Sequence, residues 1–220
     1  MAGRAADAVK PRLRGLSHTV AFLAALPLGV LLVLRADTTL ARIAALVFAV
    51  SVVTMFGASG LYHSPNWPER QRRWLRRLDH VGIFGLIAGT YTAVGLLVLH
   101  GDWRPVVLSI VWAGALAAAL FKLAWVDAPK WISAVLGIAL GWVGVVVAPQ
   151  LLDAIGIGGM TLVLAGGLLY TAGALVYALR RPDPYPTVFG FHEVFHVLVI
   201  AAVACQYTAV AFFVLPAAGV

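Results

Sequence analysis

Long apolar segments, separated by short polar or basic stretches, follow one another along almost the whole chain. Hydrophobic residues make up 62% of its 220 positions and charged residues only 11%, which gives a mean hydropathy of +0.94. A water-soluble fold of this size does not tolerate such a composition. The sequence therefore predicts an all-α polytopic membrane protein.

The number of apolar segments predicts a seven-transmembrane-helix bundle. A hydrocarbon core about 30 Å thick needs roughly 20 apolar residues for each helical crossing. The predicted spans lie near residues 16–35, 39–63, 78–99, 105–125, 131–148, 157–179 and 190–215. We interpret residues 1–15 as a short cytoplasmic N-terminal segment and residues 16–220 as a single membrane domain.

The positions of the sixteen Lys and Arg residues predict the orientation of the bundle. Positive charge near the ends of spans tends to stay on the cytoplasmic side. With the N-terminus in the cytoplasm, thirteen of these residues lie inside and only Arg35, Arg42 and Arg104 lie outside. The C-terminus is then outside. The net charge of +7 indicates topology and an affinity for anionic membrane lipids, not nucleic-acid binding.

Polar side chains gather at the predicted inner ends of three spans. Ser59 and His63 are four residues apart near the end of the second span, so they share one helix face. Asp79 opens the third span, and His192 and His196 open the seventh with the same spacing of four. Such groups are costly inside a bilayer and usually face the bundle interior. We therefore expect them to meet at one depth.

Three neutral imidazoles would leave one position of a tetrahedral zinc ion open for water, as in catalytic sites. The metal would lower the pKa of that water and polarise a substrate carbonyl. The sequence predicts a zinc site with the ligands His63, His192 and His196. Asp79 is the candidate general base, and Ser59 would orient Asp79 or the water. His18 and His100, near span ends, are interpreted as interfacial or loop residues.

The string His192-Glu193-Val194-Phe195-His196 also matches the H-E-x-x-H motif of zinc metalloproteases, in which the glutamate is the general base. A membrane-embedded protease needs a carboxylate from elsewhere as its third ligand. The carboxylates of the predicted outer loops lie on the wrong side, whereas Asp127 on the inner side remains a candidate. Because a motif of five residues is easily met by chance, proteolysis is the minor alternative.

Three motifs in this order resemble the hemolysin III family, which is related to the adiponectin and progestin receptors. They are Ser59-Gly60-Leu61-Tyr62-His63, then Leu78-Asp79-His80 leading to Ile87-Ala88-Gly89-Thr90-Tyr91-Thr92, and then His192-Glu193-Val194-Phe195-His196. The resemblance extends from the second predicted span to the seventh. The short segment before the first span is more similar to bacterial members, which implies an integral protein of a bacterial plasma membrane.

The resemblance implies a seven-helix protein with a cytoplasmic N-terminus and a zinc ion near the inner leaflet. His63, His192 and His196 correspond to the family's zinc ligands, Asp79 to the aspartate that holds the zinc water, and Ser59 to the serine of the same motif. Receptor relatives are linked to hydrolysis of the amide bond of ceramide. Bacterial members carry the name hemolysin and are associated with membrane-lipid homeostasis.

Three functions remain open at this point. The leading hypothesis is a zinc-dependent hydrolase of an amide or ester bond in a lipid substrate. The first alternative is a non-catalytic membrane sensor or regulator in which the zinc is structural. The second alternative is a cytolysin, as the family name suggests. A pore needs a water-lined path, and the outer halves of the predicted spans are almost wholly apolar.

Overall fold

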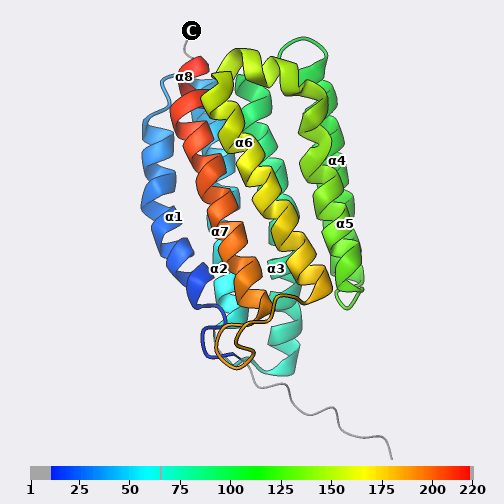
Figure 1. Ribbon diagram of the computed structural model, residues 1–220. Helices are drawn as coiled ribbons and strands as arrows, with labels where there is room; N and C mark the ends of the chain where they lie inside the picture. The colour runs from blue at the N-terminus through cyan, green and yellow to red at the C-terminus, as the bar shows by residue number, and fades with distance from the viewer. Residues whose placement is uncertain (1–10, 65, 219–220) are drawn as a thin grey trace, which may run out of the picture.

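A computed structural model describes residues 11–64 and 66–218 of the chain (Figure 1). Residues 1–10, with Arg4 and Lys10 of the charge argument, lie outside the described residues, so the predicted 1–15 segment is described only from residue 11. The described part is helical, apart from one isolated β-bridge between Tyr185 and Phe189. Its helices are α1 (Leu16–Leu34), α2 (Thr39–His63), α3 (Glu69–Leu97), α4 (Trp103–Ala124), α5 (Lys130–Gly141), the 3-10 helix η1 (Trp142–Val147), α6 (Ala148–Leu179), α7 (Phe191–Ala209), the π-helix η2 (Val210–Val214) and α8 (Leu215–Ala217).

Six helical stretches of the described residues are long and apolar enough to cross a membrane. Five of them contain the apolar parts of predicted spans one to four and seven. The remaining stretch, Lys130–Leu179, contains both predicted spans 131–148 and 157–179 in 50 residues. A straight helix of that length would measure about 75 Å. Its backbone leaves the helical conformation at Gly156 (φ 63, ψ −178), and Figure 1 shows α5 and the later part of α6 as neighbouring rods.

The third helix begins earlier than its predicted span. It starts at Glu69, directly after Pro68, and not near residue 78. The added residues, 69–77, are mostly Arg, Glu and Gln, which are too polar for an apolar span but have high helix propensity. α3 therefore has a charged first part that extends beyond its apolar part.

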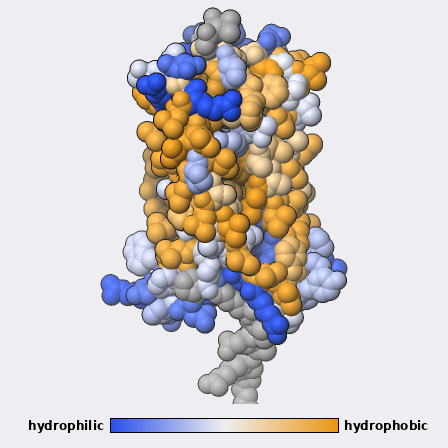
Figure 2. Space-filling view, turned by 90° about the vertical axis from the view of Figure 1, so that its left-hand side faces the viewer, coloured by the Kyte–Doolittle hydropathy of each residue, from blue (hydrophilic) through white to orange (hydrophobic). Residues whose placement is uncertain are grey.

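The outer surface of the bundle is apolar between two polar ends. Figure 2 shows hydrophobic side chains over the middle of one face and hydrophilic side chains at both ends. Large apolar residues such as Leu23, Val30 and Leu34 of α1 are 60%, 60% and 73% exposed. A continuous surface of this kind favours contact with lipid over contact with water. The structure confirms the predicted class, an all-α membrane protein.

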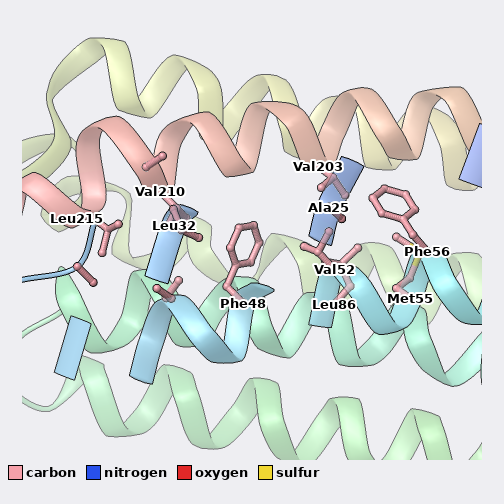
Figure 3. Close-up of a cluster of buried hydrophobic side chains, with 14 of the residues drawn as sticks. Ala25, Leu32, Phe48, Val52, Met55, Phe56, Leu86, Val203, Val210 and Leu215 are labelled. Atoms are coloured by element: carbon pink, nitrogen blue, oxygen red, sulfur yellow. The ribbon is translucent and has the colours of Figure 1, made fainter. Parts of the chain in front are cut away.

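Two groups of buried apolar side chains hold the helices together. The first lies between α1, α2, α3 and α7 and includes Leu32, Phe48, Val52 and Val203 (Figure 3). The second joins α3 and α4 to η1 and the beginning of α6. Because each group ties together helices that are distant in sequence, the ends of these helices are fixed relative to one another.

Two glycines let the start of α1 lie against the end of α2. Gly15, which precedes α1, has a φ of 86°, and a Cβ there would collide with His63 and Ser64. A Cβ at Gly60 would meet Thr19 in the same way. Small residues permit such close approach between helices in membranes. As a result, the first turns of α1 are adjacent to the predicted site residues of α2.

Candidate metal centre

The structure brings the five predicted site residues to one end of the bundle. Ser59 and His63 lie in the last two turns of α2, His192 and His196 in the first two turns of α7, and Asp79 in the third turn of α3. Figure 1 shows these parts of the three helices at its lower end. All five side chains are buried. The expectation that they would meet at one depth agrees with this arrangement.

The three histidines form a compact group of metal-ligand atoms. One ring nitrogen from each of His63, His192 and His196 lies within 4.8 Å of the others. The Nε2 atoms of His63 and His192 are 3.1 Å apart. Around a tetrahedral zinc ion, with Zn–N bonds of about 2.0–2.1 Å, ligand nitrogens are about 3.3–3.4 Å apart. The triad therefore fits a metal ion such as zinc, with ligands from α2 and α7.

Asp79 and Ser59 lie beside this triad. The Oδ2 atom of Asp79 is 3.6 Å from Nε2 of His63. The hydroxyl of Ser59 forms a hydrogen bond of 2.8 Å with Nδ1 of His18. Asp79 is not one of the three clustered histidines, but its carboxylate lies next to one of them.

The interpretation of His18 as an interfacial residue was wrong. Its side chain is only 2% exposed and faces the bundle interior, because α1 begins at Leu16 and packs closely on α2. Ala25 and Leu32, which follow His18 at intervals of seven residues, are the buried apolar residues of the same face. That spacing was the signal in the sequence that could have assigned His18 to the interior.

Glu193 does not have the position that the metalloprotease alternative requires. It is 1% exposed, its Oε2 accepts the backbone N–H of Gly190 at 2.8 Å, and its Oε1 pairs with Nε of Arg14. This side chain therefore caps the start of α7 and binds the N-terminal segment. Asp127, the remaining candidate for a third ligand, is mostly exposed and pairs with Arg76 at 2.6 Å. Both carboxylates are engaged away from the triad.

An apolar cavity of about 210 Å³ begins beside the triad, where it is lined by His192. His18, Ser59, Asp79 and His192 line one end of it, and its walls come mainly from α3, α5, α6 and α7. The lining continues along α7 as far as Gln206. Fourteen residues of helix correspond to about 21 Å. The cavity thus joins a small polar site to a long apolar space.

Comparison with known proteins matches this architecture to one family. The family model described as "Haemolysin-III related" matches residues 6–207. The chain belongs to the hemolysin III family. Hemolysin-3 of Bacillus cereus is 31% identical over 206 residues, which cover 92% of this chain and 91% of that protein. The Hemolysin-3 homolog of Bacillus subtilis (strain 168) is 29% identical over 167 residues, with 76% and 75% covered.

This chain is also similar to a plant protein that is named after an adiponectin receptor. The "Heptahelical transmembrane protein ADIPOR2" of Oryza sativa subsp. japonica is 30% identical over 183 residues, or 75% of this chain and 79% of that protein. The predicted link between the hemolysin III and adiponectin receptor families is therefore confirmed. The bacterial relatives and the six apolar helices also confirm the predicted location, an integral protein of the plasma membrane.

Removing the charge of Glu193 separates the capping role from the protease alternative. In this hemolysin III chain we expect Glu193→Gln to retain the metal and to lower the free energy of unfolding by about 1–3 kcal/mol, because Arg14 then faces a neutral amide in place of a buried carboxylate. Glu69→Gln is the control, since Glu69 is 89% exposed where it pairs with Arg73, and such pairs contribute about 0–1 kcal/mol. Thermal unfolding in detergent measures both. Hydrolysis of a peptide bond that depends on Glu193 would contradict the capping role.

Proposed function

We propose that the protein is a zinc-dependent hydrolase that cleaves an amide or ester bond in a membrane lipid. The observation that carries the proposal is the cavity, which is apolar along its length and has Asp79 and His192 at one end. The histidine triad lies at that same end. This arrangement suits a substrate with a long apolar chain and a polar bond to be cleaved.

The proposal includes a bundle of seven crossings with the metal centre on the cytoplasmic side. The 50-residue stretch Lys130–Leu179 is more than long enough for two crossings of a core about 30 Å thick, and its backbone breaks at Gly156. Arg4 and Lys10 lie outside the described residues, which leaves fourteen of the sixteen Lys and Arg residues for this comparison. All of these except Arg35, Arg42 and Arg104 belong to segments at the metal-centre end. Positive charge at that end favours a cytoplasmic location.

Each site residue has a distinct part in the proposed hydrolysis. His63, His192 and His196 would hold the zinc, which supplies Lewis acidity when bound. The apolar cavity walls would hold the acyl chain and leave its carbonyl near the polar end. The buried carboxylate of Asp79 would accept the proton that the attacking water loses. Ser59, which hydrogen-bonds to His18 and lines the same cavity as Asp79, would orient these groups.

A membrane sensor or regulator with structural zinc is the second candidate. It is favoured by the origin of the ligands, because a metal bound by His63 and His192 would connect α2 to α7 across 129 residues of sequence. The name Hemolysin-3 of the Bacillus relatives suggests a cytolysin. A pore requires a polar path, and the cavity of this chain is lined mainly by apolar side chains.

A cavity-filling variant tests the hydrolase. Gly137 of α5 lines the cavity, and a Cβ there meets no atom within 4 Å. We expect Gly137→Leu to retain zinc and to lower lipid turnover at least about ten-fold, since its side chain would fill space that the acyl chain needs, while replacing glycine favours the helix. The measurement is fatty acid released from defined phospholipid and ceramide mixtures, followed by mass spectrometry, with zinc determined on the same samples.

Gly85→Leu is the matched control. Gly85 of α3 also has no atom within 4 Å of a Cβ, but it lines a separate pocket and not the cavity. This variant should release fatty acid at the wild-type rate. Zinc in the wild-type protein without product from any lipid would favour the sensor, and full turnover in Gly137→Leu would show that the cavity does not hold the substrate.

A further inference from the structure

His18 contacts the metal-ligand group from a helix that supplies no ligand. Its imidazole ring is stacked on that of His196, with 3.7 Å between centroids and 10° between planes. Its Nδ1 is held by the hydroxyl of Ser59 at 2.8 Å, and Phe56 packs against it edge-on with centroids 5.0 Å apart. The ring is therefore fixed by two residues of α2 while its flat face covers a residue of α7.

The ring of His196 needs such support. A histidine that binds a metal is usually oriented by a hydrogen bond from its second nitrogen to a carboxylate, carbonyl or water. In the described part of the chain, the buried Nδ1 of His196 has no hydrogen-bond partner. When Nε2 binds the metal, the second nitrogen, Nδ1, therefore has no hydrogen bond that would set the ring plane. His18 is the one ring stacked face to face on His196 among the described residues, whereas His63, His192 and Phe195 meet it edge-on or tilted.

We propose that His18 is a positioning residue of the metal centre, and that it sets the plane of the His196 imidazole through stacking. Ser59 and Phe56 act through His18, because they fix its ring against α2. This inference rests on metal binding by the triad, as proposed above, and does not depend on hydrolysis. It also assigns a role to α1, which otherwise contributes only packing to the site.

Two apolar substitutions separate stacking from the other contacts of His18. His18→Phe keeps a flat ring over His196, whereas His18→Leu fills similar space without one. Both lose the hydrogen bond to Ser59, so any difference between them arises from the flat face. His100→Leu is the control, because His100 is exposed at the opposite end of the bundle.

The experiment loads each purified variant with Co²⁺ and records its visible absorption bands, which report ligand geometry. Affinity is measured by competition with a chelator. We expect His18→Leu to shift the bands and to weaken cobalt binding about ten-fold or more, the usual effect of losing an orienting partner. His18→Phe should keep the wild-type bands and stay within about three-fold of the wild-type affinity. Thermal unfolding of the metal-free forms shows whether each variant is folded.

Three results would overturn the positioning role. If His18→Leu has wild-type bands and affinity, the stacking contact does not set the ring. If both variants lose stability and affinity equally while their bands stay unchanged, His18 contributes only packing. If the wild-type protein binds no cobalt, the proposal of a metal centre is wrong, and so is the positioning role of His18. The last outcome is distinguishable because it appears before any variant is compared.

Discussion

Replacing both histidines of α7 is expected to remove zinc and lipid turnover together. The His192→Ala, His196→Ala variant keeps only His63 of the three clustered imidazoles. A single imidazole binds a metal too weakly for the metal to stay bound during purification. About one zinc ion per wild-type chain should fall to background. Release of fatty acid should fall to the rate of protein-free controls, since the Lewis acid is lost. Elemental analysis and mass spectrometry of the same preparations provide both values.

The appropriate control for this variant is His100→Ala. His100 is exposed and lies at the end of the bundle opposite the triad. Its replacement should leave zinc content and turnover unchanged. If the double variant still contains one zinc per chain, the metal is bound elsewhere and the triad is not the centre. Loss of zinc with undiminished turnover would instead show that the hydrolysis does not require the metal.

The replacement of Asp79 by Asn should separate metal binding from turnover. Asparagine has nearly the same size but cannot accept a proton at neutral pH, and the three histidines are untouched. Zinc content should stay close to wild type, while turnover should fall about 10²- to 10⁴-fold, the usual contribution of a general base. The distance of 3.6 Å between Asp79 and His63 is the geometric basis of this prediction.

Asp127→Asn serves as the comparison for Asp79. Asp127 lies at the same end of the bundle, but it is largely exposed and paired with Arg76. Its replacement should change turnover by less than about two-fold, as expected for a surface ion pair. Unchanged turnover in Asp79→Asn would refute its role as proton acceptor. If Asp79→Asn loses the metal instead, the carboxylate holds the metal centre together and is not a base.

The sequence predicted the triad because its signals are local and strong. A spacing of four residues puts His192 and His196 on one face of a helix, and His63 ends an apolar segment at the same predicted depth. Charge placement then assigned these segments to one side of the membrane. None of these steps required a contact between distant residues, which explains why the expected grouping agrees with the structure.

Features that depend on packing between helices were not predictable in this way. His18 was assigned to the interface because it lies only two residues after the start of α1, whereas its burial results from close contact with α2 at Gly15 and Gly60. The role of Glu193 depends on Arg14, which is 179 residues away in sequence. The motif around Glu193 gave no sign of that partner. Similarly, apolar length alone did not reveal that predicted spans five and six form one helical stretch interrupted at Gly156.

The separation of the proposed ligands between α2 and α7 also has a consequence for biosynthesis. His63 is translated 129 residues before His192, which at about 5–20 residues per second corresponds to about 6–26 s. During this interval the growing chain has one imidazole of the triad in the membrane and no partner for it. In the proposed metal centre, loading would therefore follow insertion of the last helix, so a ribosome-bound or truncated product that lacks α7 would carry no assembled centre.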